Sequence, residues 1–217
     1  MTDTETPDQP ARSGRRSAGE DPAKRDQILD GAGVVFLEKG FDGASMNDIC
    51  RAAGVSKGTL YVYFEDKLDL FQSLISRKRE RFYRGLEEEL NTDAPLQHRL
   101  YLFSRRMAEM LCSDEVIRAQ RIIIGSAEKM PEMAGRFYDA GASQTHRSLA
   151  TFLERECAAG RLKIDDCQLA GAQLAELSIA GLWRKRLFAK VRGKPTAEEI
   201  ERTVTSAVEM FLARYGV

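Results

Sequence analysis

Residues 54–67 read GVSKGTLYVYFEDK, and the prediction of the fold starts from this stretch. Gly54 can adopt the positive φ that a tight turn requires, and Ser56 can cap a following helix with its hydroxyl. The predicted helix, from Lys57 to about Phe64, is too short to bury much core. Polar and aromatic side chains crowd it: Lys57, Thr59, Tyr61 and Tyr63. Such a helix suits contact with a partner, and we interpret it as a helix that reads DNA.

The residues just upstream predict a second helix. The sequence Ser45-Met46-Asn47-Asp48 has the form of a capping box, with aspartate in place of the usual glutamate. A helix, a tight turn and a second helix within about twenty residues allow one helix to enter a major groove while its neighbour braces against the backbone. The run from Phe41 to Leu74 resembles the N-terminal domain of the TetR family of bacterial transcriptional regulators, in motif and in its place near the N-terminus.

This resemblance implies which residues contact DNA. Lys57 and Thr59 match positions that reach base edges, where lysine can donate to guanine and the threonine methyl can contact thymine. Gly58 lets the backbone come close, and Lys67 matches the family's phosphate-contacting lysine. The other expected contacts are Ser45, Asn47, Tyr61 and Tyr63. For Tyr61 the alternative is simple packing.

Composition places the chain among globular proteins, with 217 residues, 43% hydrophobic and 30% charged. No run approaches the roughly eighteen apolar residues of a membrane-spanning helix, and the N-terminus lacks the pattern of a signal peptide, so we expect a cytoplasmic protein. The net charge is zero, and residues 1–67 hold nine Lys or Arg against twelve Asp or Glu. DNA binding must therefore depend on local positive charge.

Four cysteines are widely scattered: Cys50, Cys112, Cys157 and Cys167. Without a C-x-x-C pair or a nearby histidine, they predict neither a disulfide framework nor a metal site, and no cofactor is expected. Cys50 stands where the family usually has alanine, and a small buried thiol fits there without a function. Oxidation of Cys112, Cys157 or Cys167 is an alternative trigger to ligand binding.

The N-terminal residues 1–20 contain almost no large apolar side chain, which predicts a flexible arm. The arm is either an inert tail or a minor-groove contact made by its arginines, Arg12, Arg15 and Arg16. The first helix should begin at Asp21-Pro22 and stop at Gly40, with Phe41 folding back on its apolar face.

Helical periodicity continues to the end of the chain. A fourth helix, capped by Asp66, should run to about Leu90 and is stiff enough to carry a shift between a distal pocket and the reading helix. Apolar stripes predict further helices that begin near Leu96, Val116, Pro131, Asp166 and Ala197. With no alternating strand pattern, the expected fold is all-α, with about nine helices.

The last two predicted helices, near residues 166–184 and 196–215, are unusually apolar. They are either buried core helices or, as we favour, a two-fold interface at which the pair from each protomer forms a four-helix bundle. The order of the C-terminal half, over much of residues 121–184, also resembles the AefR-like subgroup of the family, through IIIGSAEKMPEMAGRFYDAG, FLERECAAGRLKIDD and QLAGAQLAELSIAGLWR.

The family resemblance also implies a small-molecule pocket in the C-terminal half. Candidate lining residues are Phe103, Met107, Met110, Phe137, Tyr138, His146, Leu177 and Trp183. At least half of them should be ordinary core, because stripes of methionine and aromatic residues usually pack. His146 could bind a ligand or lie at the surface.

Together these patterns predict three segments: an arm over 1–20, a helix-turn-helix domain over 21–67, and a ligand-binding and dimerisation domain over 68–217. The expected protein is a repressor that binds a palindromic operator on double-stranded DNA as a dimer and leaves it when a partly apolar effector binds. No nucleophile, base and orienter, metal motif or phosphate loop indicates an enzyme. The alternatives are a thiol-based regulator and a nonspecific DNA-binding protein.

Overall fold

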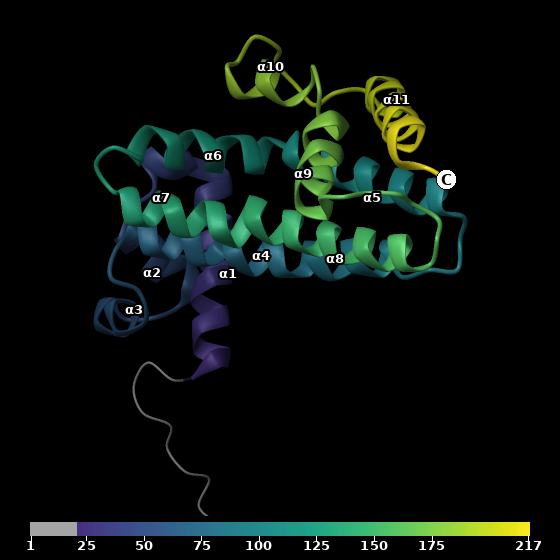
Figure 1. Ribbon diagram of the computed structural model, residues 1–217. Helices are drawn as coiled ribbons and strands as arrows, with labels where there is room; N and C mark the ends of the chain where they lie inside the picture. The colour runs from purple at the N-terminus through teal and green to yellow at the C-terminus, as the bar shows by residue number, and fades with distance from the viewer. Residues whose placement is uncertain (1–20) are drawn as a thin grey trace, which may run out of the picture. The chain divides into compact units, whose positions relative to one another are not determined.

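The computed structural model describes residues 21–217, apart from the side chains of residues 78, 80–84 and 87. The described residues form eleven α-helices and one π-helical turn, without a β-strand (Figure 1). The predicted all-α class is confirmed. The predicted arm, residues 1–20, lies outside the described residues. Within the described part, no helix is both long enough and apolar enough to cross a membrane.

The structure has eleven helices where the sequence predicts about nine, because two predicted helices are interrupted. The helix expected from Pro131 contains a π-helical turn, which divides it into α7 (Pro131–Tyr138), η1 (Asp139–Ser143) and α8 (Gln144–Ala158). The next predicted helix is α9 (Cys167–Ser178) followed by a separate α10 (Trp183–Leu187). Between these two helices the φ angle of Gly181 is 73°, which a right-handed helix excludes.

The chain divides into two compact units, one ending at Leu74 and the other beginning at Ile75. One continuous helix, α4 (Lys67–Leu90), begins in the first unit and continues in the second. The domain limits expected from the sequence, 21–67 and 68–217, stay predictions.

In the N-terminal unit, α1 (Pro22–Gly43) begins where the Asp21 carboxylate accepts a backbone hydrogen bond at 3.0 Å. Gly40 interrupts α1 with φ 69° and ψ 178°. The Phe41 ring then stacks on Phe36 with 5.8 Å between the ring centroids, so the chain folds back at the expected place. The buried face of α1 carries Ile28, Leu29, Ala32, Val35 and Phe36.

Two short helices complete this unit, α2 (Met46–Ala53) and α3 (Lys57–Tyr63). Gly54 ends α2 in the left-handed conformation, with φ 64°, and makes the tight turn between them. The helix α2 lies so close to α1 that a Cβ on Gly31 would be 2.6 Å from the backbone nitrogen of Ala53. Glycine at position 31 is therefore what lets these two helices meet.

The C-terminal unit adds α5 (Leu96–Leu111), α6 (Asp114–Ser126) and α11 (Ala197–Tyr215). One apolar core joins α5, α8, α9 and α11, and Figure 1 shows α11 beside α5 and α9. Its fully buried large side chains include Leu100, Phe103, Met107, Leu149, Phe152, Leu153, Leu174, Val204 and Phe211. Each of α9 and α11 thus buries one face within its own chain, which accounts for part of their apolar composition.

Candidate functional site

Few side chains anchor the helix α3 to the core, and much of the rest of its surface is exposed to solvent. Leu60 is completely buried, and Phe64, just beyond the helix, is almost so. These two side chains anchor α3 to the core of the N-terminal unit. The exposed residues of α3 are Lys57, Gly58, Tyr61 and Val62, with Tyr61 47% exposed and Val62 51% exposed. Sequence reasoning missed Val62, because an apolar residue in a short helix is expected to pack inside.

Local hydrogen bonds fix the start of α3. The Ser56 hydroxyl accepts a hydrogen bond from the Thr59 backbone N–H at 3.0 Å, and the two side-chain hydroxyls are 2.8 Å apart. The cap predicted at Ser56 is therefore present. At Gly58, a Cβ would come no closer than 3.9 Å to its own chain, so the missing side chain leaves open surface instead of relieving a clash. Tyr63 is half-buried.

The predicted capping box opens α2. The Asp48 backbone N–H donates to the Ser45 hydroxyl, and the Ser45 backbone N–H donates to the Asp48 carboxylate, each at 3.2 Å. Lys39 and Arg51 approach the same carboxylate at 2.8 and 2.5 Å. Hydrogen bonds from Lys39 and Ser45 hold the pKa of Asp48 well below its usual value. Ser45 is thus engaged in capping, whereas Asn47 is exposed.

Lys67 makes contacts within the N-terminal unit that the sequence does not reveal. Its ammonium group donates to the backbone carbonyls of Phe41 at 2.7 Å and of Ala44 at 3.0 Å. It also lies 4.5 Å from the centroid of the Phe41 ring. Lys67 therefore fixes the segment that leads from α1 into α2, and its expected phosphate contact stays a prediction.

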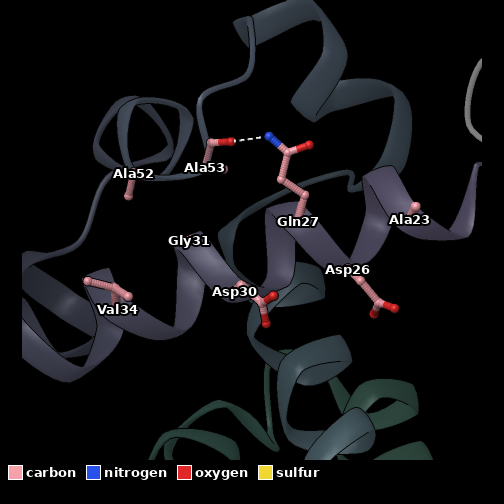
Figure 2. Close-up of a pocket in the computed structure, with 8 residues that line it drawn as sticks. All are labelled: Ala23, Asp26, Gln27, Asp30, Gly31, Val34, Ala52 and Ala53. Atoms are coloured by element: carbon pink, nitrogen blue, oxygen red, sulfur yellow. Dashed lines mark hydrogen bonds between the residues drawn. The ribbon is translucent and has the colours of Figure 1, made fainter.

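An open depression of about 600 Å³ lies between α1 and α2 (Figure 2). The Gln27 side chain crosses it and donates to the Ala53 carbonyl at 2.6 Å, which satisfies a carbonyl at the end of α2. Two carboxylates, Asp26 and Asp30, line the depression. The depression contains none of the residues predicted for DNA contact or for effector binding.

The structure brings some of the predicted effector residues together. Phe103 and Met107 lie in the core of the C-terminal unit, and Trp183 packs against that core while its indole N–H donates to Gln120 at 2.7 Å. The half-buried Phe137 lies under the Arg79 guanidinium, 4.3 Å from the ring centroid. The others are the half-buried Met110, His146 and Leu177 and the exposed Tyr138.

Sequence reasoning missed a polar residue in the same core. The Ser104 hydroxyl is completely buried, and none of the described residues supplies it with a hydrogen-bond partner. The sequence does not indicate that this serine is buried, except that it lies between the apolar residues Phe103 and Met107.

Two of the three candidate sensor cysteines, Cys112 and Cys167, lie in environments that disfavour the thiolate. Burial raises the pKa of the Cys112 thiol to about 11. Burial and the neighbouring Cys157 thiol raise the pKa of Cys167 to about 11. Because the thiolate is the reactive form, these environments suppress reactivity at neutral pH. The thiol-based alternative is therefore not supported, and Cys50 is a buried thiol as expected.

A capped α2, a glycine turn and an exposed α3 define a DNA-binding protein of the helix-turn-helix class. Residues 28–74 match the bacterial regulatory proteins of the tetR family, and residues 98–217 match the C-terminal domain of AefR-like transcriptional repressors. The second match covers more than half of the chain. The chain therefore belongs to the TetR family of DNA-binding transcription regulators, with an AefR-like C-terminal domain, and the predicted resemblance is confirmed.

Individual relatives agree with this family. The transcriptional repressor BepR of Brucella suis is 46% identical over 65 residues, which cover 30% of this chain and 31% of BepR. The fatty acid metabolism regulator of Bacillus subtilis is 33% identical over 88 residues, covering 41% of this chain and 45% of that protein. These matches span less than half the length of the curated relatives. Both relatives are named as regulators.

Solved structures resemble the chain over most of its length. A TetR-family regulator from Mesorhizobium loti is 28% identical with a TM-score of 0.81, covering 90% of this chain and 98% of that chain. The flavonoid-responsive regulator FrrA is 32% identical with a TM-score of 0.68 and the same coverage.

Proposed function

We propose that the protein is a repressor that binds a palindromic operator as a homodimer and leaves it when a small molecule binds in the C-terminal unit. The observation that carries this proposal is the surface of α3, where Lys57, Gly58 and Tyr61 are exposed beside a single buried leucine. A helix with this exposure gains little from packing, so its residues are available to base edges.

The proposed DNA contacts divide into two groups. Lys57, Gly58 and Thr59 at the start of α3 face base edges, together with Tyr61 and Tyr63. Phosphate contacts come from the start of α2, where the partial positive charge of a helix N-terminus favours an anion, and from Lys67. These contacts are Ser45, Asn47 and Lys67.

The proposed effector is a partly apolar small molecule. Phe103, Met107 and Trp183 offer it an apolar environment, and the unpartnered Ser104 hydroxyl offers one hydrogen bond. The flavonoid response of FrrA, which shares 32% of its residues with this chain, supports an effector of this kind. The continuous helix α4 is suited to transmit the effect, because it contributes residues to both units.

Selection of bound fragments from a random duplex library with the purified protein tests this function. We expect enrichment of one inverted repeat, with affinity for it at least about 10³-fold above that for random duplex. Equal affinity for all sequences would instead indicate the nonspecific alternative. A screen of apolar compounds against the protein–operator complex then identifies the effector by loss of the complex.

A further inference from the structure

The segment between α9 and α11 is strongly positively charged. Residues 183–194, which we call the basic connector, read WRKRLFAKVRGK and hold six Lys or Arg and no Asp or Glu. The rest of the chain therefore holds 27 Lys or Arg against 33 Asp or Glu. The connector also exposes Phe188 and Val191, by 79% and 44%. Phe188 is the most exposed aromatic side chain among the described residues.

Hydrogen bonds hold the basic connector in place. Arg186 is buried and donates to the Asp114 carboxylate at 2.5 Å, to the Cys112 carbonyl at 3.2 Å and to the Gly193 carbonyl. From α6, Arg121 donates to the Leu187 carbonyl at 2.8 Å. These hydrogen bonds fix the backbone at Leu187 and at Gly193, on either side of the exposed residues 188–192. The exposure of Phe188 is thus a fixed feature of the surface and not the fraying of a loose loop.

The backbone beside Phe188 is also in a costly conformation. Ala189 has a φ of 55°, the one positive φ at a residue other than glycine within the described part of the chain. Such a conformation persists when the surrounding contacts impose it, and it is commonly found where a surface has a binding role.

Most cations of the basic connector lack an ion-pair partner. Arg184 lies 3.8 Å from Glu176 on α9. Within the described part of the chain, the other exposed cations form no ion pair: Lys185, Lys190, Arg192 and Lys194. A surface with exposed apolar side chains among unpaired cations fits a partner that is apolar and acidic.

The exposed side of α9 adjoins the basic connector, and α11 packs against α9. The Arg184–Glu176 contact joins the connector to the exposed side of α9, and the Tyr215 hydroxyl of α11 donates to Gln173 of α9 at 2.8 Å. These helices leave two large apolar side chains exposed, Leu169 and Met210. They also expose the carboxylates of Glu198 and Glu209. The chain itself therefore offers both the apolar side chains that can pack against Phe188 and the carboxylates that can face the connector's cations.

We propose that Phe188 of the basic connector anchors the two-fold interface by packing against α9 and α11 of a second copy of this chain, with Lys190 and Arg192 facing carboxylates of that copy. This proposal rests on the dimer of the proposed function and extends its interface to a segment outside the two long helices. A two-fold dimer presents each surface twice, so one connector serves each copy. An exposed, preorganised aromatic residue is the usual kind of interface anchor.

Sedimentation equilibrium of the full chain over a concentration series tests the proposal. We expect Phe188→Ser to raise the dimer dissociation constant at least about 50-fold and to lower operator affinity in parallel. The matched control is Leu37→Ser, which changes an equally apolar side chain that is 74% exposed in the N-terminal unit, and it should leave the dimer unchanged. Should Phe188→Ser fold poorly, Lys190→Glu combined with Arg192→Glu tests the same surface.

The outcomes separate this proposal from the proposed function. A wild-type dimer that Phe188→Ser leaves equally tight would overturn the role of Phe188 and leave the repressor intact. A wild-type chain that stays monomeric at every concentration, with or without operator, would overturn both.

A flotation experiment tests whether the connector binds a lipid bilayer instead of a second copy. It uses phosphatidylcholine vesicles, with and without phosphatidylglycerol. Binding to the anionic vesicles that Phe188→Ser abolishes, with no change in the dimer, would assign the surface to a bilayer and overturn the proposal.

Discussion

The Lys67 ammonium group donates a hydrogen bond to the Phe41 backbone carbonyl at 2.7 Å, which ties the start of α4 to the chain between α1 and α2. The partners are 26 residues apart in the sequence. Because α2 begins directly after this segment, Lys67 influences the helix-turn-helix through the backbone, whether or not it also touches a phosphate.

Lys67→Met should therefore destabilise the protein. Losing hydrogen bonds from a charged donor to backbone carbonyls costs about 1.5–3 kcal/mol, and we expect a lower melting temperature. Because Lys67 is also a proposed phosphate contact, affinity for operator and for random DNA should fall by a similar factor, with a salt slope of binding smaller by about one. A lower melting temperature with an unchanged salt slope would show that Lys67 acts only through the backbone.

Gly31 and Gly33 of α1 form a matched pair of substitutions. A Cβ at Gly31 would lie 2.6 Å from the Ala53 backbone nitrogen, whereas a Cβ at Gly33 would lie 3.7 Å from a Leu74 methyl group. Gly31→Ala should cost about 1–3 kcal/mol and weaken DNA binding, because α2 must move away from α1. Gly33→Ala should be neutral or stabilising by up to about 1 kcal/mol through helix propensity. Chemical denaturation measures both, and equal effects would contradict the close approach.

The buried carboxylate of Glu156 predicts a pH dependence of stability. It accepts hydrogen bonds from Arg99 at 3.0 and 3.1 Å and from Arg161 at 2.5 Å. Burial raises the pKa of Glu156, but the hydrogen bonds from Arg161 and Arg99 outweigh burial and lower it. A lowered pKa stabilises the fold above the unfolded value of about 4.3, and this stability is lost as the pH falls through the folded pKa.

The variant Glu156→Gln isolates this effect. At neutral pH it should cost about 3 kcal/mol, because it leaves the buried Arg99 without its counter-charge. The difference in the free energy of unfolding between wild type and variant should shrink on acidification to about pH 3. A difference that is constant with pH would show that the Glu156 charge does not stabilise the fold.

Lys57→Ala should relax the base preference at one position of each half-site. A lysine that donates to a guanine edge contributes about 1–3 kcal/mol of discrimination. Comparing the selected sequences of variant and wild type measures the effect. Lys129→Ala, an exposed lysine between α6 and α7, is the control and should leave the preference unchanged. Loss of affinity without loss of preference would show that Lys57 contacts only the DNA backbone.

Local signals made much of the DNA-binding half predictable. The caps at Ser45 and Ser56 and the turns at Gly40 and Gly54 depend on neighbours within a few residues, so the sequence contains the whole signal. The division of the helix after Pro131 was not predictable, because a single π-helical turn is a short interruption inside a longer helical stretch and has no sequence signal of its own.

Long-range contacts were not predictable, because their partners lie far apart in the sequence. Lys67 reads as a surface lysine, and Arg186 reads as one cation of a solvated run, although it is buried against α5 and α6. The exposure of Val62 and the burial of Ser104 likewise depend on which face of a helix meets its neighbours. The effector candidates share this difficulty, since a Met and aromatic stripe has the same sequence pattern in a core and in a pocket.

Operator binding by a variant of the exposed α3 surface tests the central claim most directly. With the selected inverted repeat as probe, Tyr61→Ala should weaken binding at least about fivefold, since a side chain that contacts DNA contributes about 1–3 kcal/mol. Leu37→Ala, on the exposed side of α1, should bind as the wild type does. Equal affinities for wild type, Tyr61→Ala and Leu37→Ala, in proteins of equal stability, would contradict the reading of DNA by α3.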